Sequence, residues 1–250
     1  MQAQYIERTL LSVIDQNYPN IEYFVQDGGS KDGTIEILMR HEKKLSGWVS
    51  EPDMGQSNAI NSGFNRTSGE IMGWLNSDDL LLPGALNHVV NYFNVHPDVD
   101  VVYGNRLLID GRDMEVGRWI LPGHDDKILS WVDFIPQETL FWRRSIWDKS
   151  GGRIDESFHF AMDWDLLLRF RKAGAKFGHI PQFIGAFRVH AQQKTSHKIH
   201  ELGQQEMNRI RLGCFGYIPS QREIRKAISP FLIKHVFFDK FHAIKDRLRG

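Results

Sequence analysis

Short apolar strands and amphipathic helices alternate along the first hundred residues, and this alternation limits the possible folds more than any other feature. Residues 3–16 carry apolar side chains at helical spacing, and residues 21–26 alternate as a strand. The same order of strand, loop and helix repeats up to a strand predicted at residues 99–103. We therefore expect an α/β fold with a mostly parallel sheet and helices on both faces. Ligands of such folds bind at the carboxyl ends of the strands.

The rhythm changes after residue 104. A hairpin is predicted over residues 106–119, and a helix with an apolar inner face begins at Asp163. Late strands are predicted within residues 177–189, and beyond His197 the chain becomes helical, polar and basic. The second half thus departs from the regular alternation of the first.

The composition excludes several classes of protein. The 250 residues include 31 Lys and Arg against 31 Asp and Glu, so no nucleic-acid partner held by bulk positive charge is expected. A single cysteine, Cys214, excludes an intramolecular disulfide and a cysteine-based zinc cluster, which fits a reducing compartment. No run of about 18 uncharged apolar residues is present, and the first residues do not resemble a signal peptide. We predict a cytoplasmic protein.

Two adjacent carboxylates, Asp78 and Asp79, follow the apolar run at residues 71–75. Adjacent carboxylates raise each other's pKa unless a cation or hydrogen-bond donors offset their charge. Hard oxygen ligands of this kind suit Mg²⁺ or Mn²⁺. The alternative is that one Asp caps the following turn and the other is solvated. Their position at the end of a buried strand favours a functional role.

Three more polar positions stand where predicted strands end or helices begin. Asp27 ends a strand and precedes two glycines. It belongs either to a loop whose backbone a ligand can approach or to an ordinary turn. Asp163 begins a helix, where it is either the N-cap or a general base held against a substrate hydroxyl. His190 follows a late strand and is either a metal or phosphate ligand or a structural histidine.

Four segments in register carry a resemblance to a known family: DGGSKDGT, EPDMGQSNAINSGF, GEIMGWLNSDDLLLPGAL and FAMDWDLLLRFRKAG. In this order they resemble the inverting glycosyltransferase family 2, over about residues 2–195. The resemblance implies the Rossmann-like GT-A fold, a nucleotide-diphosphate sugar donor and a divalent metal, Mg²⁺ or Mn²⁺. It also implies inverting transfer to the hydroxyl of a saccharide or lipid-linked saccharide, in bacterial cell-envelope polysaccharide or glycolipid synthesis.

The resemblance implies a donor-binding set. The first acidic loop of the family falls on Asp27, and a second Asp near the base falls on Asp53. The metal motif Asp-x-Asp falls on Asn76-Ser77-Asp78, so this sequence lacks the first acid. The expected donor-binding residues are Asp27, Gly29, Asp53, Gln56, Asn76 and Ser77.

The same comparison assigns the metal and the base. Asp78 is expected to hold the metal, together with the late family histidine, which matches His190. The catalytic Glu-Asp motif falls on Met162-Asp163, so Asp163 alone is left as the base. Asp79, beside the metal-binding Asp78, is expected to be an orienting or acceptor-side residue, and so are Trp164 and Asp165.

The resemblance also predicts the domain organisation. Family members begin with a strand at the middle of the sheet, whereas this sequence begins at the helix after it, so that first strand is expected to be missing. A GT-A domain is expected over residues 1–195, with a donor half at 1–104, an acceptor half at 105–195 and a helical, basic C-terminal extension at 196–250.

The extension carries eight basic against three acidic residues over 222–249, with apolar residues between them. This composition predicts either peripheral contact with the inner face of the cytoplasmic membrane or a helix folded over the catalytic domain.

Two rival functions remain open. A degenerate relative that lost the leading acids of both motifs would bind a nucleotide sugar without turnover. A metal-dependent nucleotidyltransferase or phosphohydrolase would use Asp78 and Asp79, but the motif order and Asp163 count against it.

Overall fold

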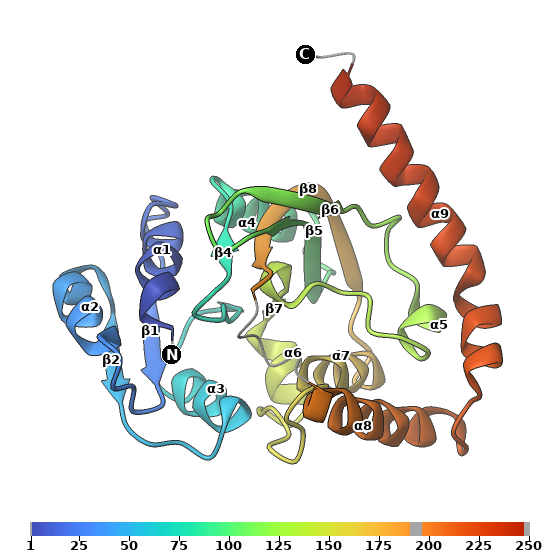
Figure 1. Ribbon diagram of the computed structural model, residues 1–250, viewed down its shortest axis with the longest axis horizontal. Helices are drawn as coiled ribbons and strands as arrows, with labels where there is room; N and C mark the ends of the chain where they lie inside the picture. The colour runs from blue at the N-terminus through green and yellow to red at the C-terminus, as the bar shows by residue number, and fades with distance from the viewer. Residues whose placement is uncertain (1, 191–196, 248–250) are drawn as a thin grey trace.

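The computed structural model describes residues 2–190 and 197–247, and it shows the mixed α/β fold that the sequence predicts (Figure 1). The expected boundary at residues 195/196 lies outside the described residues. The first half contains α1 (Ala3–Ile14), β1 (Phe24–Asp27), α2 (Thr34–His41), the 3-10 turn η1 (Glu42–Lys44), β2 (Gly47–Ser50), α3 (Gln56–Phe64), β3 (Ile71–Met72), β4 (Leu80–Leu81) and α4 (Ala85–Val95).

The second half begins with the longer strands. It contains β5 (Val101–Ile109), β6 (Glu115–Trp119), α5 (Asp126–Leu129), the 3-10 turn η2 (Gln137–Thr139), β7 (Phe141–Arg143), α6 (Arg144–Lys149), α7 (Met162–Lys172) and β8 (Phe177–Arg188). The extension consists of α8 (His197–Phe215) and α9 (Gln221–Arg247). The predicted hairpin is β5 and β6, and the two late strands are one irregular strand, β8.

The strands form two separate sheets. In the smaller sheet, β1 pairs with β2 in parallel, with Phe24 opposite Gly47. The larger sheet has the order β3-β7-β5-β8-β4, and β6 adds to β5. Within it only β5 and β8 run parallel, so the expectation of a mostly parallel sheet is wrong for this part. The reason is that the regular alternation of strands and helices ends after residue 104. Hairpins and irregular connections allow antiparallel pairing, whereas helical crossovers join parallel strands.

A cleft separates the two sheets. Among the described residues β1 pairs only with β2, and β3 pairs only with β7. The cleft between them has a volume of about 1330 Å³ and includes Val25 on one wall and Met72 and Leu75 on the other. No strand within the described residues joins the two sheets across the cleft.

The largest part of the core lies under the second half of the chain. Trp142 of β7 and Trp164 of α7 are completely buried there, with Phe170 on the inner face of α7. Ile210 of α8 and Phe231 of α9 belong to the same cluster, so the extension packs on the second half of the domain. A separate small cluster joins α1 and α2 to the β1–β2 sheet.

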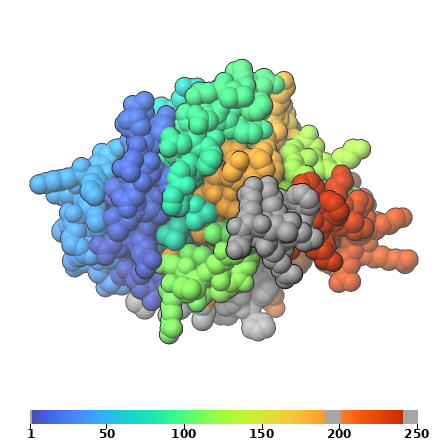
Figure 2. All heavy atoms as spheres, turned by 90° about the horizontal axis from the view of Figure 1, so that it is seen from above, coloured from blue at the N-terminus to red at the C-terminus, as the bar shows by residue number. Residues whose placement is uncertain are grey.

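The two helices of the extension lie on one side of the molecule, and α9 stands out at its edge (Figures 1 and 2). Pro230 lies within α9. In the part of the chain that the structure describes, no helix combines the length and the apolar content needed to cross a bilayer.

Candidate active site

Asp27 is the anchor of the first loop in the cleft. Its carboxylate accepts hydrogen bonds from the N–H groups of Gly29 and Ser30, at 3.0 and 2.8 Å, and from the hydroxyls of Ser30 and Ser50, both at 2.6 Å. Burial raises the pKa of Asp27, but the hydrogen bonds from Ser30 and Ser50 hold it below its ordinary value. Gly29 has a φ of +81°, which favours glycine. The carboxylate therefore stays ionised and shapes the loop.

Asp53 lies against this loop. A Cβ atom on Gly28 would stand 2.5 Å from its Oδ2, so a side chain at this position would displace the Asp53 carboxylate. Oδ1 of Asp53 accepts the N–H of Gly55 at 2.8 Å, immediately before α3. The structure thus brings Asp27 and Asp53 to one end of the cleft, as the sequence predicts.

Asn76 connects three parts of the cleft. Its Oδ1 accepts from Gln56 of α3 at 2.7 Å, and its Nδ2 donates to Asp79 at 3.1 Å and to Gln137 of η2 at 2.9 Å. The amide thus occupies the position of the missing acid without bringing charge. The sequence did not indicate Gln137, because the region around η2 has no periodic pattern.

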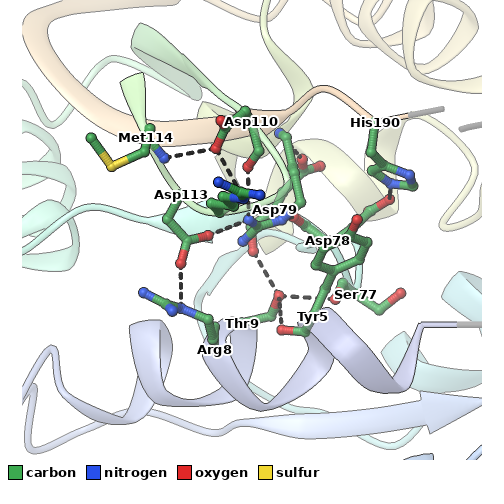
Figure 3. Close-up of polar contacts among 12 residues, drawn as sticks. Tyr5, Arg8, Thr9, Ser77, Asp78, Asp79, Asp110, Asp113, Met114 and His190 are labelled. Atoms are coloured by element: carbon green, nitrogen blue, oxygen red, sulfur yellow. Dashed lines mark hydrogen bonds and ion pairs between the residues drawn. The ribbon is translucent and has the colours of Figure 1, made fainter. Parts of the chain in front are cut away.

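The loop at residues 76–79 is fixed from below by α1. The Thr9 hydroxyl donates to the carbonyls of Ser77 and Asp79, at 2.9 and 2.8 Å. Asp78 lines the cleft, and its Oδ2 lies 3.0 Å from Nε2 of His190 (Figure 3). The same oxygen accepts a hydrogen bond from the side chain of Gln2 at 3.2 Å. The two predicted metal ligands therefore meet in space, although 112 residues separate them.

Asp79 has a different role from its neighbour. It is only 1% exposed, and its Oδ1 accepts the N–H of Arg188 at 3.1 Å. Burial raises the pKa of Asp79 well above its ordinary value, and the charges of Glu138 and Asp78 raise it further. Asp79 is therefore a buried group that fixes the loop to the β8 backbone, and its expected orienting or acceptor-side role stays a prediction.

Arg188, at the end of β8, connects this loop to the labelled Asp110 and Asp113 (Figure 3). Its side chain is completely buried, donates to the carbonyl of Asp78 at 2.8 Å and to that of Asp110 at 3.1 Å, and pairs with Asp113. Asp113 also pairs with Arg8 of α1. The sequence analysis missed Arg188, although a charged residue inside an apolar strand was a usable signal.

Asp163 lines the same cleft, in the first turn of α7. Its Oδ1 accepts the N–H of Trp164 at 2.9 Å. Burial raises the pKa of Asp163 from 3.8 to about 6, against the lowering effect of its hydrogen bond to Trp164 and of the nearby Arg106 charge. A carboxyl poised there is ionised at neutral pH but is a stronger base than an ordinary aspartate.

Trp164 and Asp165 are placed differently from each other. Trp164 is completely buried, with its Nε1 donating to the carbonyl of Leu129 at 2.7 Å, so it orients Asp163 through its backbone and packing. Asp165 pairs with Arg169 at 2.8 Å and is not among the residues that line the cleft. The structure does not bring Asp165 to the acceptor side.

Three further charged groups surround Asp163 that the sequence analysis missed. Burial, and then the Asp163 charge, raise the pKa of Asp133 well above its ordinary value. Arg106 binds Glu138 in a two-point ion pair, at 2.8 and 2.5 Å, and both line the cleft. Asp133 and Glu138 lie in the irregular region before β7, where the sequence offered no signal.

Glu206 of α8 holds the loop that leads into α7. Its carboxylate accepts the N–H groups of His159, Phe160 and Ala161, at 2.8, 2.8 and 2.9 Å. Ala161 is the N-cap residue of α7 and the other two residues directly precede it, so the carboxylate lies next to the helix N-terminus, where a negative charge is favourable. The extension therefore contributes directly to the position of Asp163.

Solved structures share this fold. The Staphylococcus aureus protein TarS, in a crystal structure with UDP-GlcNAc, aligns with a TM-score of 0.69 and 15% identity, over 96% of this chain and 71% of TarS. The mannosyltransferase PcManGT from Pyrobaculum calidifontis, in complex with GDP-Man and Mn²⁺, aligns with a TM-score of 0.63 and 18% identity, over 94% of this chain and 66% of that one. These likenesses establish the GT-A fold.

The sequence comparisons identify the family. An uncharacterised glycosyltransferase of Rickettsia typhi is 29% identical over 212 residues, which cover 82% of this chain and 66% of the relative. The chain thus spans about two thirds of the length of that relative. The family model described as glycosyl transferase family 2 matches residues 2–192. The chain therefore belongs to glycosyl transferase family 2.

Proposed function

We propose that this chain is an inverting glycosyltransferase that moves a sugar from a nucleotide-diphosphate donor to an acceptor hydroxyl. The observation that carries the proposal is Asp163, a carboxyl with a pKa of about 6, in the same cleft as Asp27, Asp53 and Asp78. The complexes of the structural neighbours with UDP-GlcNAc and GDP-Man support a nucleotide-sugar donor. The donor panel described below is designed to identify the sugar and the nucleobase of the donor.

The proposed reaction is a single displacement. The acceptor oxygen forms a bond with the anomeric carbon as the bond from that carbon to the diphosphate oxygen breaks, and the electron pair leaves with the diphosphate. Asp163 takes the proton of the acceptor hydroxyl. Because the N–H of Trp164 occupies one carboxylate oxygen, the other is left for the acceptor.

The donor is proposed to bind at the opposite wall of the cleft. Asp27 and Asp53 would contact the nucleoside, and Gly28 leaves room for the Asp53 carboxylate against the first loop. Gly29, which was also expected in the donor set, shapes this loop but is not among the residues that line the cleft. The donor set is completed there by Gln56, Asn76 and Ser77, which line the same cleft.

A divalent cation, Mg²⁺ or Mn²⁺, is proposed at Asp78 and His190. Among the described residues no group of three or more His, Cys, Asp or Glu is gathered to hold a metal. A pair consisting of one carboxylate and one imidazole, 3.0 Å apart, fits a cation that completes its shell with water and substrate phosphates. Such a cation supplies charge neutralisation for the departing diphosphate. Mn²⁺ in the complex of PcManGT supports this assignment.

The acceptor is proposed to be a saccharide or a lipid-linked saccharide of cell-surface polysaccharide or glycolipid synthesis. We place the reaction in the cytoplasm, at the inner face of the cytoplasmic membrane. The single cysteine fits a reducing compartment, and a lipid-linked acceptor would be reached at that face.

The test is release of nucleoside diphosphate from a panel of UDP-, GDP- and dTDP-sugars with Mn²⁺ or Mg²⁺. The wild-type chain is compared with Asp163→Asn and with a matched control, Asp98→Asn, whose exposed carboxylate pairs with Lys176 away from the cleft. Metal-dependent release that disappears only in Asp163→Asn would support the proposal.

A non-catalytic nucleotide-sugar-binding protein is the alternative, and a specific observation favours it. Asn76 and Met162 stand where the family has acids, so both acidic motifs are incomplete. Donor binding without release in any of the variants, at any donor of the panel, would favour this alternative. Release of pyrophosphate or inorganic phosphate would indicate a nucleotidyltransferase or a phosphohydrolase instead.

A further inference from the structure

Helix α9 is attached to the protein by one face. Ile224 and Phe231 on that face are 5% and 7% exposed, and the ring of Phe231 lies 4.7 Å from that of Phe134. One turn further, the His235 ring meets the edge of Trp119 at 6.2 Å. These contacts fix the orientation of α9, so its opposite face is directed to solvent.

The opposite face is apolar, which is unusual for a helix surface turned to water. Leu232, Ile233, Val236 and Phe237 are 49%, 70%, 51% and 68% exposed. Their spacing of one and four residues places them side by side on the helix. We call these four residues the outer patch. Exposed apolar residues gathered in this way mark an interaction site more often than single ones do.

Positive charge surrounds the outer patch. Lys226 and Lys240 stand seven residues before and after Ile233, which puts them on the same face, and Lys234 borders it. All three lysines are exposed. Over residues 221–240 the helix has five Lys and Arg against two Asp and Glu. The surface is therefore apolar at its centre and cationic at its rim.

We propose that the outer patch and its lysines bind the surface of an anionic lipid membrane, with α9 lying in the plane of the headgroups. Apolar side chains on one face, with lysines flanking them, are the combination that interfacial helices use. Anionic lipids attract each lysine, whereas a second copy of α9 would bring the same positive charges together. The exposed fractions of its four side chains show that the outer patch is accessible, and α9 lies at the edge of the molecule (Figure 2). The proposal does not depend on the proposed function.

The test is cosedimentation of the full chain with vesicles of phosphatidylglycerol and phosphatidylcholine, compared with vesicles of phosphatidylcholine alone. Binding is expected only with the anionic lipid. Ile233→Ser/Phe237→Ser should weaken it at least tenfold. Lys226→Gln/Lys234→Gln/Lys240→Gln should weaken it about 100-fold at low salt, because each lysine near the surface contributes about fivefold.

Two controls separate this inference from the others. Val95→Ser/Met114→Ser removes exposed apolar side chains elsewhere and should leave vesicle binding unchanged. Asp163→Asn should bind vesicles like the wild type, so loss of turnover and loss of membrane binding are read independently. Equal binding to both kinds of vesicle, no binding by the wild type, or a dimer that disappears in Ile233→Ser/Phe237→Ser would overturn the proposal.

Discussion

Replacing Asp163 by Asn should make the protein more stable at pH 7 while it removes the proposed base. Burial is the main reason why the pKa of Asp163 is raised from 3.8 to about 6. A carboxyl with a raised pKa in the folded state contributes stability that is fully present below its unfolded pKa and is lost as the pH rises through its folded pKa. At pH 7 this contribution is gone, because the buried carboxyl is ionised.

The size of the effect follows from the two pKa values. The interval from 3.8 to about 6 corresponds to about 3 kcal/mol, at 1.36 kcal/mol for each pH unit. Asparagine keeps an oxygen that accepts the N–H of Trp164, and it has no charge to desolvate. Asp163 is partly exposed in the cleft, so solvent screening makes this figure an upper bound.

Urea unfolding of the wild type and Asp163→Asn, at pH 7 and below pH 4, measures the difference. The variant should be more stable at pH 7, and the two proteins should converge at the lower pH, where both side chains are neutral. Asp98→Asn is the control, because its exposed carboxylate has a lowered pKa, held there by a hydrogen bond from Lys176. A variant that is less stable than the wild type at pH 7 would refute the assignment of Asp163 as a desolvated base.

Other contacts of the cleft predict further outcomes. Nucleoside diphosphate release should fall about tenfold for each pH unit below 6, because Asp163 must be ionised to take a proton; a flat profile down to pH 5 would contradict this. Glu206→Ala removes three hydrogen bonds to backbone N–H groups and should lower the free energy of unfolding by about 2–5 kcal/mol, whereas the exposed Glu201→Ala should not. Arg188→Met removes the buried partner of Asp113 and should cost about 3–5 kcal/mol; a thermal midpoint within a degree of the wild type would be inconsistent with that role.

Local patterns predicted most of the strands and helices, but not β4 (Leu80–Leu81) or α5 (Asp126–Leu129). The apolar spacing of residues 3–16 predicted α1, and the apolar run at 71–75 led directly to Asp78 and Asp79. Such features arise from residues that are close together in the sequence, so they can be recognised without the structure. The run at 71–75 forms only a two-residue strand, β3, because pairing with β7 is limited to Ile71 and Met72.

The parts of the site that the sequence did not reveal depend on pairing across long distances. Arg106 and Glu138 are 32 residues apart, and Glu206 meets Ala161 across 45. Neither pair has a spacing that indicates contact before the fold is known. The burial of Asp79 could not be predicted either, because it results from contact with the β8 backbone and from the nearby Glu138, which only the fold brings together.

The separation of the sheets has a consequence for how the molecule opens. β1 and β2 are mostly half-buried, and with α1 and α2 they have an apolar cluster of their own. Helix α1 also packs against the larger sheet through Val13, but strands with few buried side chains unfold locally at a lower free energy than buried ones. Backbone amides of β1 should therefore exchange with deuterium earlier than those of β5. A nucleotide that contacts Asp27 on one side and Asp78 on the other would fasten the two units, and slower exchange in β1 would then report occupancy of the cleft.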